Sequence, residues 1–127
     1  MISMRQETVH SFTEKEEEFA NLLIAIGMKK NSAKVLVFLA SMSEATSREI
    51  ERGLDMRQPE VSVAMKYLMD QDWIRHREST HEKKGRTVRI YELAKPMTVI
   101  INSIEKEKKN NANNQLNIFR KLREDLP

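Results

Sequence analysis

Residues 47–73 constrain the fold of this chain more than any other segment. They contain a short amphipathic stretch that ends at Gly53, a tight turn, and a second amphipathic stretch that begins around residues 57–59. In the second stretch, apolar residues recur at i, i+4 and i+7, the spacing of one buried helix face: Val61, Met65 and Leu68. Two short helices joined in this way predict a helix-turn-helix.

The second helix of this motif carries polar residues on the face that its apolar stripe leaves free. We expect Asp55 to cap this helix, and Pro59 fits only in its first turn, where no intrahelical amide bond is lost. Gln58 can bond adenine bidentately, and Arg57 can bond guanine or a phosphate. The residues predicted to read bases are Arg57, Gln58, Pro59, Ser62, Val63 and Lys66. The alternative is an ordinary surface helix whose polar face is solvated.

Two stretches with strand-like alternation follow the helix-turn-helix directly. Residues 73–79 and 86–93 alternate in polarity, and Gly85 supplies a turn between them. Trp73 and Ile74 are expected to open the first strand, and Val88 and Ile90, with Leu93 as a further candidate, to form the inward face of the second. This strand pair predicts a wing, and the whole unit then becomes a winged helix, a shape that usually reads duplex DNA.

The predicted wing concentrates the positive charge of the chain. Residues 73–89 contain six Lys or Arg and two Glu, a local charge of +4, whereas the net charge of the whole chain is +3. Such a hairpin can lie along the DNA backbone or enter a minor groove. The residues predicted to hold the backbone are Ser47, at the start of the preceding helix, and Arg75, Arg77, Lys83, Lys84 and Arg86. The alternative is a solvated edge hairpin that its lysines protect from aggregation.

Composition predicts a cytoplasmic, nucleoid-associated protein that is not an enzyme. The chain has no cysteine, no apolar run of membrane-spanning length and no export signal at its N-terminus. His10, His76 and His81 lack neighbours at a spacing that suggests a catalytic pair or a metal site. There is no glycine-rich phosphate loop and no nucleophile elbow either. We therefore expect no catalytic residue, no cofactor and no metal.

The remaining segments predict further helices around the winged helix. One helix begins at Thr13 and ends at Gly27, and a second spans residues 33–42 with Asn31 or Ser32 as its cap. Thr46 or Ser47 is expected to cap the first helix of the helix-turn-helix, and a long last helix spans residues 96–125. The fold class is mainly α with a small β-hairpin (α+β). The chain is predicted to be a single domain, 1–127, with a winged-helix core at 31–93.

The last predicted helix carries the argument for a dimer. It would be about 45 Å long, whereas a compact chain of this size has a diameter of roughly 36 Å. A projecting helix of this kind would leave its far apolar cluster in water unless a second copy covered it. The predicted two-fold interface uses both terminal helices: Phe19, Leu22, Leu23, Ile100, Ile104, Leu116, Phe119 and Leu122. The alternative is a helix that folds back near residues 110–114 onto its own domain.

Several motifs resemble the DNA-binding domain of TrmB-type regulators, which are mostly archaeal. Residues 19–28 (FANLLIAIGM) and 31–35 (NSAKV) are similar to the opening of that domain. Residues 45–50 resemble its second helix and residues 56–68 its recognition helix, and the resemblance extends over 19–93. The wider MarR and ArsR winged helices share this skeleton. The resemblance implies a transcriptional regulator, usually dimeric. Full-length TrmB proteins have a sugar-binding domain after the wing, where this chain has a single helix, so sugar sensing is not carried over.

Two functions from different classes follow from these observations. The first is a homodimeric, sequence-specific regulator that binds double-stranded DNA, with the recognition helix in the major groove and the wing on the backbone or in the minor groove. The second is a winged helix that serves protein contact, as a subunit of a transcription complex or another assembly. A docking face would be apolar, whereas the predicted base-reading face is mainly polar. No residue set argues for an effector ligand, so the sequence leaves the effector unknown.

Overall fold

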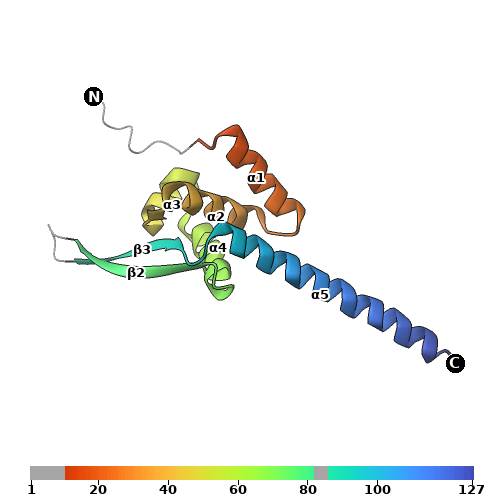
Figure 1. Cartoon of the computed structure of the whole chain (residues 1–127). Coiled ribbons are helices and arrows are strands. Elements are labelled where there is room, and N and C mark those ends of the chain that lie inside the picture. The colour runs from red at the N-terminus through yellow and green to blue at the C-terminus, as the bar shows by residue number, and fades with distance from the viewer. Residues whose placement is uncertain (1–10, 82–85) are drawn as a thin grey trace. The chain divides into compact units, whose positions relative to one another are not determined.

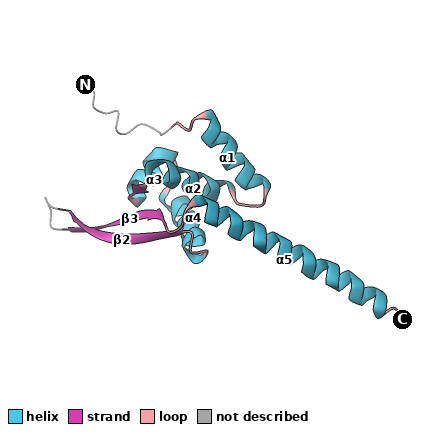
Figure 2. Ribbon diagram, viewed as in Figure 1, coloured by secondary structure: helices cyan, strands magenta, loops and turns pink. Residues whose placement is uncertain are grey.

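A computed structural model describes residues 11–81 and 86–127. Its elements, in chain order, are α1 (Glu14–Ala25), α2 (Lys30–Met42), β1 (Glu44–Ala45), α3 (Ser47–Leu54), α4 (Gln58–Asp70), β2 (Ile74–His81), β3 (Arg86–Leu93) and α5 (Met97–Glu124) (Figure 1). The predicted fold class is confirmed, because helices dominate and the strands form one small sheet beside them (Figure 2). The chain divides into two compact units, residues 1–94 and 95–127.

Helix α2 lies at the centre of the first unit. It contacts α1, α3 and α4, and its buried side chains include Val35, Leu36, Phe38 and Leu39. The prediction that Asn31 or Ser32 caps this helix is wrong. The helix begins at Lys30, since Lys29 has extended dihedral angles and its carbonyl accepts the Ala33 amide at 2.9 Å. The two predicted caps therefore lie inside the first turn.

Helices α1 and α3 begin with the same local device, a capping box. The Thr13 hydroxyl accepts the Glu16 amide at 3.1 Å, and the Glu16 carboxylate accepts the Thr13 amide at 2.9 Å. Thr46 and Glu49 repeat this arrangement with distances of 3.1 and 2.8 Å. Each box satisfies two backbone amides that a helix start leaves without partners. Of the two predicted caps for α3, the structure uses Thr46.

The turn between α3 and α4 differs from the prediction at two residues. Helix α3 continues past Gly53 and ends at Leu54. Its C-cap residue is Asp55, which adopts the left-handed conformation with φ 54°. Asp55 thus terminates α3, and the expectation that it caps α4 is wrong. The N-cap of α4 is Arg57, whose backbone amide donates to the Glu60 carboxylate at 2.9 Å. Pro59 lies in the first turn of α4, as predicted.

Gly53 is required for helix packing and not for a turn. It is buried inside α3, and a Cβ atom on it would lie 2.5 Å from Cε1 and 2.7 Å from Cζ of Phe38. These separations are shorter than real carbon atoms tolerate, and Phe38 is itself buried. The absence of a side chain at Gly53 lets α3 approach α2 closely.

The sheet has the antiparallel order β1-β3-β2. The two-residue strand β1 was not predicted, and it pairs Glu44 with Glu92 and Ala45 with Tyr91. Along β3, Val88 and Ile90 are half-buried and Thr87 and Arg89 are exposed, which is the predicted alternation, but Tyr91 is buried and was not predicted to be. A two-residue period places Tyr91 on the opposite face of the strand from Val88 and Ile90, so β3 is covered on both faces near its end.

The second unit consists of α5 and its short flanks. The 28 residues of α5 span about 42 Å at 1.5 Å per residue. Ile100 and Ile104 are buried, whereas every residue from 105 to 127 is exposed. Large apolar side chains therefore lie in solvent along the second half of the helix: Leu116, Ile118, Phe119 and Leu122.

Candidate nucleic-acid interface

The outer face of α4 is open to solvent. Val61, Ala64, Met65 and Leu68 point into the core of the first unit. The opposite face is defined by six exposed residues, which are the six that were predicted to read bases: Arg57, Gln58, Pro59, Ser62, Val63 and Lys66. We call this set the α4 outer face. Its separation from the buried stripe leaves hydrogen-bonding groups free to meet a ligand in a groove.

Contacts within α4 arrange the polar groups of this face. The Gln58 amide donates to the Ser62 hydroxyl at 2.9 Å, one helical turn further on. The Lys66 ammonium group forms an ion pair with Asp70 at 3.3 Å, in which both side chains are well exposed. Exposed pairs of this kind contribute little to stability and exchange readily with other partners. The groups that would contact bases or phosphates are thus held only loosely in the free protein.

Glu60, which is also exposed on α4, has a structural role at the start of the helix. A carboxylate near phosphate is repulsive, although it can accept a hydrogen bond from the N4 amino group of a cytosine. Here the Glu60 carboxylate accepts the backbone amide of Arg57, the N-cap residue of α4. It thereby compensates the positive end of the helix dipole and fixes the start of α4.

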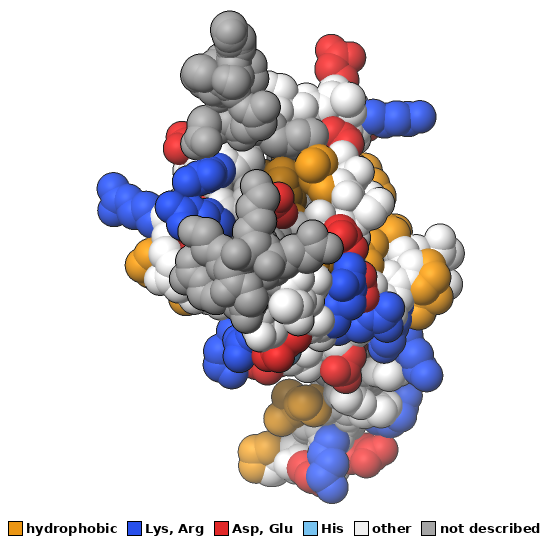
Figure 3. Space-filling view, turned by 90° about the vertical axis from the view of Figure 1, so that its left-hand side faces the viewer, with side chains coloured by type: hydrophobic (Ala, Val, Ile, Leu, Met, Phe, Trp, Pro, Cys, Tyr) orange, Lys and Arg blue, Asp and Glu red, His pale blue; other side chains and the backbone are white. Residues whose placement is uncertain are grey.

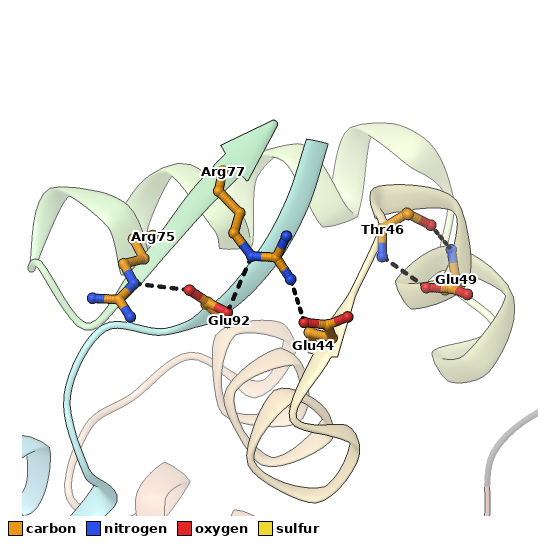
Figure 4. Close-up of polar contacts among 6 residues, drawn as sticks. All are labelled: Glu44, Thr46, Glu49, Arg75, Arg77 and Glu92. Carbon is orange, nitrogen blue, oxygen red and sulfur yellow. Dashed lines mark hydrogen bonds and ion pairs between the residues drawn. The ribbon is translucent and has the colours of Figure 1, made fainter. Parts of the chain in front are cut away.

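The base of the wing contains a cluster of four charged side chains (Figure 4). Arg75 pairs with Glu92 at 3.0 Å, and Arg77 lies 2.5 Å from Glu44 and 3.7 Å from Glu92. Strand β2 supplies the two arginines, whereas β3 and β1 supply one carboxylate each. We call Glu44, Arg75, Arg77 and Glu92 the wing-base cluster. It joins all three strands through their side chains.

The wing-base cluster changes the charge balance that the sequence suggested. The local charge of +4 counted only residues 73–89, so it omitted both carboxylates that pair with Arg75 and Arg77. In the view of Figure 3, Lys and Arg side chains lie beside Asp and Glu side chains, so this face is mixed in charge. The pairing of Arg75 with Glu92 follows from the hairpin register, but Glu44 could be found only once β1 was known.

The other predicted backbone contacts are only partly described. Ser47 is the first residue of α3 and is half-buried. Lys83 and Lys84 lie outside the described residues, as does the side chain of Arg86. Of the predicted backbone set, the described side chains thus lie at the start of α3 and in the wing-base cluster.

The predicted dimer residues fall into three groups. Leu23, Ile100 and Ile104 are buried within the single chain, so they are not available as surface. Phe19 is half-buried and Leu22 is 58% exposed. The remaining members lie on the exposed half of α5: Leu116, Phe119 and Leu122.

The described residues provide neither a cluster of metal ligands nor a membrane-spanning helix. In residues 11–81 and 86–127, no three His, Asp or Glu side chains come together as a metal site would require. No helix in the same ranges combines the length and apolar character needed to cross a bilayer.

Comparison with known proteins supports the interpretation of this fold. Residues 26–85 match the model of the MarR family. This MarR-type segment contains α2, α3, α4 and β2, hence the helix-turn-helix and the first strand of the wing. The match points to DNA-binding regulation, and it confirms both the predicted resemblance and the prediction that the chain is not an enzyme. No curated protein matches the sequence.

Solved structures extend the similarity beyond the MarR-type segment. A possible transcriptional regulator from Methanosarcina mazei Go1 has a TM-score of 0.63 at 17% identity, over 95% of this chain and 99% of that one. The archaeal chromatin protein TrmBL2 has a TM-score of 0.68 at 14% identity, over 87% of this chain but only 41% of that protein. A MarR family transcriptional regulator from Silicibacter pomeroyi DSS has a TM-score of 0.50 at 17% identity, over 89% and 68%. These similarities show a shared winged-helix fold.

Proposed function

We propose that this protein is a sequence-specific transcriptional regulator that binds double-stranded DNA as a homodimer. Helix α4 enters the major groove, and the wing lies on the backbone or in the minor groove. Arg57, Gln58 and Ser62 read base edges, and Lys66 holds a phosphate. Binding to DNA in this manner would occur in the cytoplasm, at the nucleoid.

The observation that carries this proposal is the α4 outer face. A helix that reads bases must keep its polar side free of its own core, and the six residues of this face are exposed. The match of the MarR-type segment to a family of regulators supports the same function. A docking surface for protein would instead present a continuous apolar patch, and here only Pro59 and Val63 are apolar.

The proposed homodimer rests on the exposed half of α5. Leu116, Phe119 and Leu122 follow one another at intervals of three residues, so they share one side of the helix. An unpaired apolar stripe of this length on a soluble helix is typical of a helix–helix interface. In a two-fold dimer that binds an inverted repeat, the two copies of α4 would meet successive turns of the major groove, roughly 34 Å apart.

Selection of bound duplexes from a random pool tests the proposed function directly. We expect an enriched inverted repeat, since a two-fold dimer places the same reading face on both half-sites. Enrichment of a single half-site would retain DNA reading but reject the dimer. Recovery of no preferred sequence would reject sequence-specific regulation.

The same apolar stripe on α5 favours a second candidate function, a winged-helix subunit that docks onto another protein. Light scattering on the purified chain separates the two candidates. A mass of twice 14.9 kDa agrees with the homodimer. A monomer that also fails to enrich any duplex would favour the docking function.

A further inference from the structure

Helix α2 lacks the N-terminal capping contact that the other helices of its unit share. Helices α1, α3 and α4 each have a glutamate at their third position that accepts the backbone amide of the N-cap residue. In α2 the third position is Ser32, the first turn has no acidic residue, and no side chain caps the helix. The first amides of α2 therefore retain the positive end of the helix dipole.

Positive side chains accumulate at this same helix start. Lys29 is the N-cap residue and Lys30 is the first residue of α2, and both are exposed. Lysine at a helix N-terminus is repelled by the dipole, so this placement is unfavourable in the absence of an anion. The helix start thus combines backbone amides with two ammonium groups.

Ser32 provides an independent indication of a ligand. Its relative exposure is 3%, and it is the one buried polar residue among those that the structure describes. No hydrogen bond of its hydroxyl occurs within the described ranges. A buried hydroxyl without a partner is costly, which favours a bound acceptor at this position.

These groups line one cleft of about 480 Å³, whose other wall is α4. The α2 side is formed by Lys29, Lys30, Asn31 and Ser32, and the α4 side by Pro59, Glu60, Val63 and Ala64. Two lysines outnumber the one carboxylate, and Glu60 is already bonded to the Arg57 amide. Pro59 and Val63 also belong to the α4 outer face, so the cleft borders the surface that is proposed to enter the groove.

We propose that the start of α2 binds a phosphate group, and that this group is a DNA backbone phosphate flanking the base pairs contacted by α4. The Lys30 and Asn31 amides and the Ser32 hydroxyl donate to the phosphate oxygens, while Lys29 and Lys30 balance the charge. The identity of the phosphate as DNA rests on the proposed function, whereas the oxyanion site itself does not.

Two variants test the site on the full chain. Lys29→Gln with Lys30→Gln should lower the slope of log affinity against log salt concentration by up to about 0.9 per lost phosphate contact. Lys15→Gln with Lys106→Gln removes the same charge from exposed positions of α1 and α5 and should leave the slope unchanged. Ser32→Ala should weaken DNA binding about three- to tenfold without lowering the melting temperature, since the hydroxyl loses no protein partner. Equal slopes in all variants, with unchanged affinity for Ser32→Ala, would overturn the proposal.

Titration with inorganic phosphate, followed by the amide resonances of Lys30, Asn31 and Ser32, separates the two sources of phosphate. We expect saturable shifts in these amides that duplex DNA competes away. Saturable shifts in a protein that binds no duplex would reject both the proposed function and DNA as the source, while leaving an oxyanion site. DNA binding without any response of these amides to DNA or phosphate would reject the site and leave the proposed function intact.

Discussion

Gln58 and Ser62 share a hydrogen bond of 2.9 Å that a bound base would replace. Both side chains are exposed, so this bond contributes little to the folded state. It does hold the Gln58 amide above the next turn of α4, where an adenine edge could bond it bidentately. Gln58 thus has a small structural role and a larger proposed role in reading bases.

Replacement of Gln58 by alanine separates these two roles. Gln58→Ala should cost roughly 1–3 kcal/mol on the preferred duplex and leave binding to non-specific DNA unchanged. Fluorescence anisotropy on both duplexes measures the difference, with Gln71→Ala at the end of α4 as the matched control. An equal loss on every sequence would remove Gln58 from the set of base-reading residues.

Gly53 shows a residue whose importance lies in packing alone. Gly53→Ala places a methyl group within 2.5 Å of the Phe38 ring, so we expect a loss of about 1–3 kcal/mol in the free energy of unfolding. Urea denaturation measures this loss. In a Phe38→Leu background the loss should shrink, because the ring atoms that clash are gone. The same loss in both backgrounds would show that the clash with Phe38 is not its cause.

At the scale of elements, the helices and the two strands of the wing were predictable, whereas the short strand β1 was not. Thr13 and Pro59 are local signals, because a cap or a ring acts within one turn of its own helix. Strand β1 consists of two residues, and it can be recognised as a strand only by its pairing with β3. The burial of Tyr91 has the same cause: Tyr91 pairs with Ala45 of β1, so alternation within β3 alone does not reveal that its second face is also covered.

The candidate site was likewise predictable where the signal is local and unpredictable where it depends on distant residues. The α4 outer face follows from the spacing of Val61, Met65 and Leu68, so the complete set could be predicted and is exposed. The sequence also marked Arg75 and Arg77 as free cations, whereas the fold brings Glu44 and Glu92 against them. Long-range charge pairing depends on strand register, and sequence spacing does not encode it directly.

The wing-base cluster makes a prediction about the sheet as an element. Glu44→Gln with Glu92→Gln should strengthen binding to all duplexes and steepen its salt dependence, because Arg75 and Arg77 lose their competing carboxylates. The free energy of unfolding should change by about 1 kcal/mol or less per ion pair, because the two arginines are largely exposed although Glu92 is half-buried. Glu17→Gln with Glu18→Gln changes the charge equally on α1 and serves as the control. If both pairs of substitutions strengthen binding equally, net charge explains the effect and the cluster does not.

At the scale of the whole molecule, the second half of α5 is the element that remains to be explained. Its exposed leucines and Phe119 would be unfavourable in water, so a second copy is the proposed cover. Truncation after Asn110 removes this stripe and should convert the dimer to a monomer in light scattering. Asn113→Ala in the full chain is the control and should leave the dimer intact. A truncated chain that remains a dimer would refute this interface.

The position of β3 in the middle of the sheet has a consequence for how this protein can tolerate change. With β1 on one side and β2 on the other, β3 cannot slide, because a shift of one residue would turn Tyr91 outward. Strand β1 pairs with β3 only at Tyr91 and Glu92. Insertions of equal length in β2 and β3 between Ser79 and Val88 would therefore lengthen the hairpin without disturbing that pairing. The length of the wing can therefore vary during evolution without affecting the core. A single-residue insertion near Tyr91 would instead shift the register of β3.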